Sequence, residues 1–440
     1  MSIEQLYQLY LQATGVTTDT RNIPAGSIFF ALKGEKFNAN LFAAEALEKG
    51  AAYAVVDEVA DTALGDLYGN RLIEVENVLN TLQALAGYHR KQFKAPVIGI
   101  TGSNGKTTTK ELVAAVLAAK YKTYATKGNL NNHIGIPLTL LAINKDDIEM
   151  AVIEMGANHQ GEIASYCAYV QADYGLITNI GSAHLEGFGG FEGVIKGKTE
   201  LYTDLLARNC SIFVCADNQL LLDNIQQKSS LYPQWNRALK LITYGKQADA
   251  YCKGSIAPSG EFLSVEVEGT IIQTNLVGEY NFDNVMAAIC IGKYFNVPMR
   301  SIKEAIESYL PSNNRSQKVA YGNSTIILDA YNANPSSMGE ALRNFDKQPG
   351  KNKIVILGEM MELGEYSRTE HEKIKAQVEQ MALNGKVFTG NGFAFLANHP
   401  GVQWFATTTE LKEWFKAQQF NGALILIKGS RKNELEKLLQ

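Results

Sequence analysis

The stretch VIGITGSNGKTTTKE, from Val97 to Glu111, decides the fold that the sequence predicts. Its apolar beginning is typical of a buried strand, and Gly102 and Gly105 allow a tight turn whose backbone amides point inward. From Lys106 onward the pattern predicts a helix, in which the lysine amine can reach phosphate oxygens and the Thr107 hydroxyl can bind Mg2+. This order of elements predicts a site for the phosphates of a nucleotide. The predicted contacts in the loop are Gly102, Ser103, Asn104, Gly105, Lys106, Thr107 and Thr108.

The loop is a shortened form of the common phosphate-binding motif. The full pattern GxxxxGK[ST] requires glycine at position 100, where this chain has Ile100, so the match is to TGxxGKT. An ordinary glycine loop ahead of a helix is the alternative. The phosphate-binding interpretation is favoured because strand, loop, GKT and helix occur in the right order.

Composition limits the classes of function that the chain can have. Its 440 residues, 46% hydrophobic and 20% charged, indicate a globular protein with room for about three domains. The net charge of -4 is nearly balanced, and we therefore expect neither a nucleic-acid partner nor membrane insertion. No leader pattern and no membrane-length apolar run is found, which predicts a cytoplasmic protein. The five scattered cysteines lack CxxC spacing, so we expect buried thiols and no zinc or redox site.

The alternation of helix and strand patterns predicts an α/β protein of three domains. Residues 1–93 mix short strands and helices and predict a small α/β domain. Residues 94–310 predict a doubly wound, mostly parallel sheet around the phosphate loop, with a strand-rich excursion off that sheet between Tyr251 and Val277. Residues 311–440 predict a Rossmann-like domain, and the lack of a GxGxxG fingerprint gives no support for a nicotinamide cofactor.

Polar segments follow three of the predicted central strands, where ligands of such sheets bind. GNLNNHIG contains Asn129 and Asn132 as candidate substrate contacts. Glu154 ends the strand before EMGANHQGE, and His184 lies in NIGSAHLEGFG, so both are candidate metal contacts, with Glu154 the more natural ligand of Mg2+. A helix-capping glutamate and an ordinary loop histidine are the alternatives.

Two lysines, Lys196 and Lys198, lie in a predicted helix downstream of His184. A lysine amine kept neutral by desolvation can take up CO2 as a carbamate, which would convert a cation into an oxygen ligand for a second Mg2+. The residues alone do not choose between the two lysines, and an exposed helix lysine is the ordinary alternative.

Further candidates could bind the rest of a nucleotide. Asn281 and Asn284 open a helix, where an amide could read a base edge, although Asn281 could instead be an N-cap. Arg315 at the domain junction could follow transferred phosphate charge, and Asp329 at a strand end could accept from ribose hydroxyls. A surface ion pair and a strand-end cap are the alternatives for these two. In the first domain, donors that suit an anionic, hydroxyl-rich ligand are Thr20, Arg21, Ser27, Lys33 and Gly34, although solvated surface residues are the simpler explanation.

Several segments resemble the Mur ligases, and the resemblance runs through all three predicted domains. They are TGSNGKTTTKE, GNLNNHIGIPLTLL, EMGANHQGEIA, NIGSAHLEGFG followed by KGKTELY, and DAYNANPSSM. DTRNIPAGSIFFALKGEKF is similar to the UDP-binding segment of that family. YNANP, Tyr331 to Pro335, is similar to a segment of the type that adds D-alanyl-D-alanine, whereas the DNPR motif of the diaminopimelate- or lysine-adding type does not occur in the sequence.

The resemblance implies an ATP-dependent cytoplasmic ligase that joins D-alanyl-D-alanine to UDP-N-acetylmuramoyl-tripeptide (UDP-MurNAc-tripeptide). The implied reaction phosphorylates the terminal carboxylate of the tripeptide, and the dipeptide amine attacks the acyl phosphate, with two Mg2+ ions holding the phosphates. The third tripeptide residue stays open between diaminopimelate and lysine, and we expect a monomer. A regulatory homologue without catalysis and a ligase with another acceptor, such as a folate polyglutamating enzyme, are the alternatives.

The resemblance also implies roles for single residues. Lys198, four positions before the aromatic residue of KTELY, matches the lysine that carries the carbamate in the family, and Asn281 matches the residue that reads adenine. Arg315 and Asp329 are similar to the phosphate and ribose contacts. The implied catalytic residues are Lys106, His184, Lys198 and Arg315, and the implied metal contacts are Thr107, Glu154, His184 and Lys198. The implied substrate contacts are Thr20, Arg21, Ser27, Lys33, Gly34, Asn129, Asn132, Asn332 and Asn334.

Overall fold

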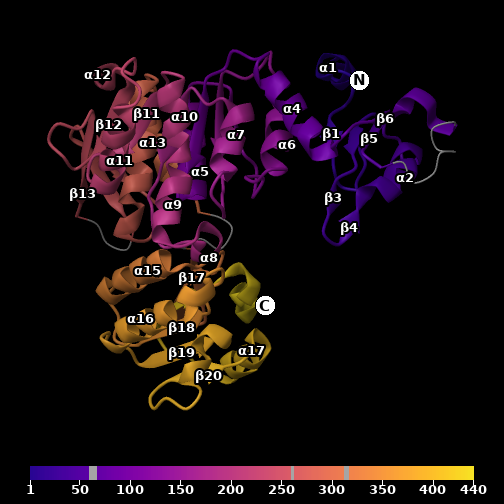
Figure 1. Ribbon diagram of the computed structural model, residues 1–440. Coiled ribbons are helices and arrows are strands. Elements are labelled where there is room, and N and C mark those ends of the chain that lie inside the picture. The colour runs from indigo at the N-terminus through magenta and orange to yellow at the C-terminus, as the bar shows by residue number, and fades with distance from the viewer. Residues whose placement is uncertain (59–66, 259–261, 312–316) are drawn as a thin grey trace.

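Figure 1 shows a computed structural model, which describes residues 1–58, 67–258, 262–311 and 317–440. Three α/β bodies follow one another along the chain. The N-terminal body lies beside the central one, and the C-terminal body lies below it in this view. The predicted α/β class and the three-part architecture are confirmed. Arg315 lies outside the described residues.

The N-terminal body is built on a small parallel sheet of order β1-β2-β5-β6. Its strands are β1 (Val16–Thr17), β2 (Ile28–Phe30), β5 (Tyr53–Val56) and β6 (Leu72–Glu74). The remaining elements are α1 (Ile3–Gln12), the hairpin of β3 (Lys33–Gly34) and β4 (Phe37–Asn38), η1 (Ala39–Phe42), α2 (Ala43–Glu48) and η2 (Gly69–Arg71). The strands predicted in this region are confirmed. The 3-10 turn η1 leads directly into α2.

Helix α4 (Val78–Arg90) falls inside the first predicted domain but packs against central helices. It contacts α6 (Gly135–Leu141) and α7 (Glu162–Val170). The buried Arg90 guanidinium donates hydrogen bonds of 3.0 Å to the Val170 carbonyl and 2.8 Å to the Asp173 carboxylate. One continuous apolar core therefore joins α4 to the central body.

The central body contains a nine-stranded sheet of order β15-β14-β13-β12-β11-β10-β7-β9-β8. The strands from β13 to β8 in this order are parallel. Their bounds are β7 Val97–Thr101, β8 Thr123–Ala125, β9 Met150–Glu154, β10 Tyr174–Ile177, β11 Ser211–Cys215, β12 Leu241–Gly245, β13 Cys252–Ala257, β14 Ser264–Val267 and β15 Thr270–Gln273. The strand and loop predicted around the phosphate motif are confirmed.

The expected excursion between Tyr251 and Val277 is wrong. Strand β13 pairs in parallel with β12, and β14 and β15 then extend the same sheet in antiparallel fashion. The edge of a sheet presents unpaired backbone donors and acceptors, and a hairpin that follows in sequence can satisfy them without leaving the sheet.

Helices cover both faces of the central sheet. On one face α5 (Lys106–Ala118) packs against α13 (Phe282–Tyr294) and α14 (Met299–Ser308). On the other face α7 packs against α10 (Glu200–Ala207). The chain forms two helices here, α9 (Phe191–Lys198) and α10, which meet at Thr199, whose hydroxyl donates to the Ile195 carbonyl at 2.8 Å. The remaining elements are the helix α11 (Gln219–Ser229) and the short α8 (Leu185–Phe188), α12 (Arg237–Lys240) and η3 (Glu279–Asn281).

The C-terminal body has a six-stranded sheet of order β16-β17-β21-β18-β19-β20, parallel except for the edge strand β16. Its strands are β16 Gln317–Tyr321, β17 Ser324–Asp329, β18 Lys353–Gly358, β19 Gly385–Thr389, β20 Gln403–Phe405 and β21 Leu424–Lys428. Its helices are α15 Pro335–Lys347, η4 Gly364–Tyr366, α16 Ser367–Glu379, η5 Asn391–Leu396, α17 Thr408–Ala417, η6 Arg431–Asn433 and η7 Leu435–Leu439. The predicted Rossmann-like alternation is confirmed, and two 3-10 turns follow β21. Among the described residues of the whole chain, no helix is long and apolar enough to span a bilayer.

Candidate active site

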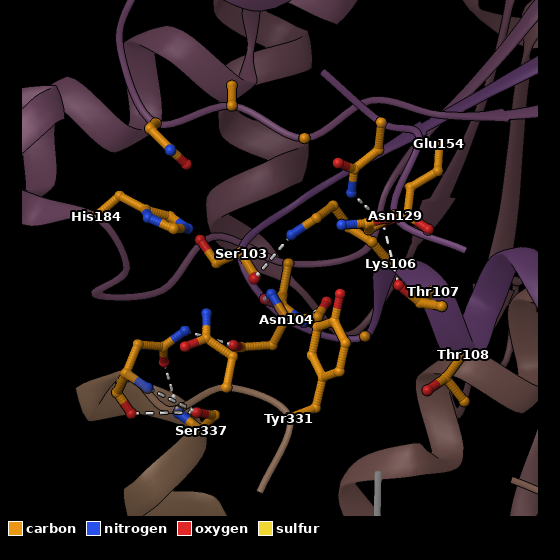
Figure 2. Close-up of a pocket in the computed structure, with 18 of the residues that line it drawn as sticks. Ser103, Asn104, Lys106, Thr107, Thr108, Asn129, Glu154, His184, Tyr331 and Ser337 are labelled. Atoms are coloured by element: carbon orange, nitrogen blue, oxygen red, sulfur yellow. Dashed lines mark hydrogen bonds between the residues drawn. The ribbon is translucent and has the colours of Figure 1, made fainter. Parts of the chain in front are cut away.

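The strand ends of the central and C-terminal bodies face a shared pocket of about 590 Å3 (Figure 2). This volume lies within the range of small-molecule sites. Residues of the central body form one wall of the pocket, and residues of the C-terminal body form the other. Of the predicted site residues, those that line the pocket are Ser103, Asn104, Gly105, Lys106, Thr107, Thr108, Asn129, Asn132, Glu154, His184, Asn281, Asn284, Asp329, Asn332 and Asn334.

The phosphate loop has the backbone that its glycines were expected to allow. Gly102 and Gly105 have φ angles of +143° and +77°. A Cβ atom on Gly102 would lie 2.0 Å from Thr178 Oγ1, so no side chain fits there. The same threonine donates a 2.6 Å hydrogen bond to the Asn104 carbonyl, which fixes the loop against the end of β10. Lys106 Nζ lies over the loop and donates to the Gly102 carbonyl at 2.8 Å.

Glu154 and Thr107 form an oxygen-rich corner at the base of this loop. The Glu154 side chain is 1% exposed, and its Oε1 accepts hydrogen bonds from Thr107 Oγ1 at 3.1 Å and from Asn131 Nδ2 at 2.8 Å. Its Oε2 is buried and has no hydrogen-bond partner among the described residues. A buried carboxylate oxygen without a donor is costly, and a cation would compensate it. The corner therefore fits Mg2+, which prefers such oxygen ligands.

His184 connects the two walls of the pocket. It lies directly before α8 with φ +53°, and its Nδ1 makes a short hydrogen bond with the Glu362 carboxylate of the C-terminal body. This hydrogen bond lowers the pKa of Glu362. The backbone N–H of Glu186 adds a 3.2 Å hydrogen bond to the Glu362 carbonyl. Glu362 was not among the predicted site residues, because it lies in the loop that follows β18 and not at the end of that strand.

Burial distinguishes the two candidate lysines. Lys196 is exposed, whereas Lys198 is fully buried. Lys198 lies behind the pocket wall, where Nζ donates to the Ala157 carbonyl at 2.9 Å and lies 4.9 Å from the centre of the Phe188 ring. Burial lowers the pKa of Lys198 well below its usual value, and the nearby Lys106 cation lowers it further. Burial therefore favours the neutral form of the Lys198 amine.

Asn281 is buried in the pocket wall and does not cap the helix that follows it. Its Nδ2 donates to the Val277 carbonyl at 2.9 Å, and its Oδ1 accepts from Asn284 Nδ2 at 2.9 Å. No side-chain cap is present at the start of α13, so the N-cap alternative is wrong. The Asn284 side chain also accepts from Thr109 Oγ1 at 3.0 Å, which connects Asn281 to the phosphate-loop helix α5.

Asp329 and Lys428 end neighbouring parallel strands and form a pair in the C-terminal wall. Lys428 Nζ lies 2.5 Å from Asp329 Oδ2, and the lysine is 2% exposed. Lys428 was missed from the sequence, although it ends the apolar run ALILIK just as Asp329 ends STIILD. The strand-end rule that selected Asp329 could have found it.

The YNANP segment joins the C-terminal body to the phosphate loop. Asn334 caps α15 by accepting from Ser337 N at 2.9 Å, and its Nδ2 donates to Asn104 Oδ1 at 2.8 Å. A second contact, from Ser182 N to Ser336 Oγ at 2.7 Å, lies beside it. Figure 2 shows Asn104, Ser337 and Tyr331 gathered at this junction.

The asparagines before α6 also reach the pocket. The Asn132 side chain accepts from the Gly135 N–H at 2.8 Å and so fixes the start of α6. Asn129, labelled in Figure 2, lies on the same loop and lines the pocket. Their places are consistent with a substrate contact, which stays a prediction.

The five donors predicted in the N-terminal body do not line this pocket. Arg21 is exposed and pairs with Asp19, and this pairing lowers the pKa of Asp19 to about 2. Lys33, in the β3–β4 hairpin with Gly34, makes a short hydrogen bond with the Glu58 carboxylate. Ser27 is buried at the start of β2, and the Thr20 carbonyl accepts from Lys49 Nζ at 3.1 Å. A nucleoside diphosphate site on these residues stays a prediction.

Comparison with known proteins agrees with the site geometry. Residues 100–292 match the Mur ligase middle domain, and residues 314–431 match the family model described as "Mur ligase, glutamate ligase domain". A relative from Bacillus subtilis, named UDP-N-acetylmuramoyl-tripeptide--D-alanyl-D-alanine ligase, is 33% identical, and the alignment covers 97% of this chain and 92% of the relative.

Two solved structures are similar over nearly the whole length. The crystal structure of MurF from Acinetobacter baumannii has a TM-score of 0.86 at 28% identity, covering 100% of this chain and 97% of that one. MurF ligase from Thermotoga maritima, crystallised in complex with ADP, has a TM-score of 0.82 at 25% identity and covers 98% of this chain and 97% of that one. The chain belongs to the Mur ligase family.

Proposed function

We propose that this protein joins D-alanyl-D-alanine to UDP-MurNAc-tripeptide, with ATP converted to ADP and phosphate. The single observation that carries the proposal is the pocket, in which a phosphate loop faces Asp329, Lys428 and the YNANP segment of a second domain. The names of the full-length relatives and the ADP bound by the Thermotoga maritima protein support the same activity.

The chemistry requires an activated carboxylate, because a free carboxylate is a poor electrophile. Transfer of the γ-phosphoryl group to the terminal carboxylate of the tripeptide forms an acyl phosphate and releases ADP. The dipeptide amine then attacks the acyl carbon, the C–N bond forms, phosphate leaves and the amine loses a proton. Catalysis of such a transfer consists mainly of positioning and charge stabilisation.

The residues of the pocket suit these tasks. Lys106 and the loop amides bind and orient the phosphates, and Asn281 offers an amide to the base. Asp329 is suited to accept from ribose hydroxyls, and Arg315 stays a predicted phosphate contact. When bound, Mg2+ would neutralise phosphate charge, and Thr107 and Glu154 would hold it, as the buried Glu154 oxygen indicates.

We propose further that Lys198 carries a carbamate that helps to hold a second Mg2+, with His184 contributing to the metal site. The neutral amine adds to CO2, an N–C bond forms, and one proton is released, which leaves a carboxylate-like anion. The support is the burial of Lys198, its lowered pKa and its place beside Ala157 in the pocket wall. Lys196, by contrast, is exposed.

The remaining assignments are also proposals. Residues 1–93 form the UDP-binding domain, 94–310 the ATP-binding domain and 311–440 the C-terminal domain. The residues that bind the UDP portion of the substrate are Thr20, Arg21, Ser27, Lys33 and Gly34. Those that bind the rest of the substrate are Asn129, Asn132, Asn332 and Asn334. We propose a monomer, supported by a pocket that one chain completes, and a cytoplasmic location, where ATP is available. Light scattering in solution tests the monomer.

Release of ADP tests the function. UDP-MurNAc-tripeptide is supplied with ATP and Mg2+, with and without D-alanyl-D-alanine, and ADP is measured. We expect release that depends on both substrates. Release with a folate substrate and glutamate would instead indicate the alternative acceptor, and nucleotide binding without turnover would indicate a regulatory homologue.

A further inference from the structure

The C-terminal wall of the pocket carries a guanidinium group that no sequence motif singled out. Arg431 follows β21 at the start of η6, lines the pocket, and lies with Cζ 6.0 Å from the centre of the Tyr331 ring. Its Nη1 donates to Glu436 Oε1 at 2.9 Å. The part of the chain that the structure describes provides no hydrogen-bond partner for its Nη2 and Nε groups. Arg431 therefore keeps donors for a ligand.

The loop that carries Arg431 is held rigidly against the neighbouring loops. Ser430, 2% exposed, accepts from Met361 N at 2.9 Å and donates to the Ala333 carbonyl at 3.3 Å. These bonds join the loops that follow β17, β18 and β21. The guanidinium group is thereby placed beside the YNANP segment before any substrate binds, and such preorganisation favours binding.

Among the described residues, the two lysine amines that line the pocket already have other interaction partners. Lys106 lies on the phosphate loop and donates to its carbonyls, and Lys428 is paired with the Asp329 carboxylate. Lys106 is thus placed to bind the nucleotide phosphates, and the charge of Lys428 is balanced by the Asp329 carboxylate. Arg431 is therefore the cation of the pocket wall that suits an anion which is neither a nucleotide phosphate nor a carboxylate of the protein itself.

The reaction supplies one such anion on the acceptor. D-alanyl-D-alanine enters with an amine, which the reaction consumes, and a terminal carboxylate, which it does not. A planar carboxylate fits the fork of an arginine better than a lysine ammonium. We propose that Arg431 binds the terminal carboxylate of the dipeptide acceptor, an assignment that rests on the proposed function.

The test compares the dipeptide acid with its amide. At saturating ATP, Mg2+ and UDP-MurNAc-tripeptide, kcat/KM is measured for D-alanyl-D-alanine and for D-alanyl-D-alaninamide in the wild type, Arg431→Gln and Arg431→Lys. Lys437→Gln is the matched control, because it removes a cation from the same C-terminal segment, where Lys437 pairs with Glu434 outside the pocket. We expect the wild type and the control to prefer the acid by about 30-fold or more, since a site built for one group rejects an analogue that lacks it.

In Arg431→Gln the preference for the acid should fall to nearly 1, through loss of the acid reaction, while KM for ATP is unchanged. Arg431→Lys should retain part of the preference. An unchanged acid-to-amide ratio in Arg431→Gln overturns the assignment, whatever the loss of rate, because a structural defect lowers both reactions equally. A selective rise in KM for UDP-MurNAc-tripeptide also overturns it, by placing a tripeptide carboxylate on Arg431.

Failure of the proposed function gives a different result from failure of this assignment. If the wild type releases no ADP in response to D-alanyl-D-alanine, the proposed function is wrong and the assignment falls with it. If release depends on the dipeptide but the ratio persists in both variants, only the assignment is wrong. Thermal unfolding of each variant confirms that the comparison is made on folded protein.

Discussion

Asn334 Nδ2, in the C-terminal body, donates a 2.8 Å hydrogen bond to Asn104 Oδ1 in the phosphate loop of the central body. The oxygen of the same Asn334 amide accepts from Ser337 N and caps α15. One side chain thus fixes the first turn of a helix and connects two domains. The position of the C-terminal body and the shape of the nucleotide loop are coupled through this amide.

The two tasks of Asn334 can be separated by mutation. Asn334→Ser keeps a good helix cap but is too short to reach Asn104, whereas Asn334→Ala loses both. We expect Asn334→Ala to lower the free energy of unfolding by about 1 kcal/mol and Asn334→Ser to leave it nearly unchanged. Both should raise KM for ATP. Thermal unfolding and ADP release measure the two effects, and a normal KM for ATP in Asn334→Ser would contradict the coupling.

Glu154 should be required for stabilisation by Mg2+. The wild type, in Mg2+ and ADP at about 100 times their dissociation constant, should gain about 2.7 kcal/mol of stability. Glu154→Gln removes the buried charge that Thr107 faces, so the additional gain from Mg2+ should be lost while ADP alone still stabilises. Thermal unfolding with ADP, with and without Mg2+, measures this. Equal stabilisation of both proteins by Mg2+ would exclude Glu154 as a ligand.

The burial of Lys198 should make the stability of the protein rise with pH. In the folded state the pKa of Lys198 is lowered by burial, and in the unfolded state the amine has its ordinary pKa of about 10.4. Between these two values the unfolded state binds more protons, so this group makes stability rise with pH. In buffer freed of CO2, Lys198→Met should therefore be more stable than the wild type at pH 7, and the difference should shrink toward pH 10. Lys196→Met, at an exposed site two residues away, is the control substitution.

Loss of Lys198 should also abolish turnover. Lys198→Ala removes the amine that the carbamate requires, so added bicarbonate should not restore ADP release. Lys196→Ala is the matched control and should keep its activity. Spectra recorded with 13C-bicarbonate should show a carbamate carbon in the wild type and in Lys196→Ala, and near-normal rates in Lys198→Ala would disprove the assignment.

Gly102 should tolerate no side chain. Gly102→Ala places Cβ against the Thr178 hydroxyl and forces a backbone at φ +143°, which L-residues rarely adopt. We expect ATP binding to weaken by at least about tenfold, with a loss of stability of about 1–3 kcal/mol. Gly128→Ala, another glycine with positive φ but with open space around it, is the control for backbone strain. Calorimetric titration with ATP distinguishes them, and equal affinities would contradict the close approach.

Local sequence determined the elements and the chemistry of the loop. The apolar run before Gly102 and the helical run after Lys106 are short-range patterns, so the strand β7, the turn and the helix α5 could all be predicted. The strand-end rule likewise found Glu154 and Asp329, because the carboxyl ends of parallel strands meet at one edge of a sheet. The same rule would have reached Lys428.

Only the tertiary structure decided which residues contact one another across the domains and which are buried from solvent. The residue types alone did not choose between Lys196 and Lys198, and the packing of Lys198 against Phe188 and the Ala157 carbonyl separates a buried amine from an exposed one. Glu362 and Arg431 line the pocket because the fold places the C-terminal loops against the central body. Burial and contact between distant segments depend on the whole fold, because desolvation and hydrogen bonding act through space and leave no local pattern in the chain.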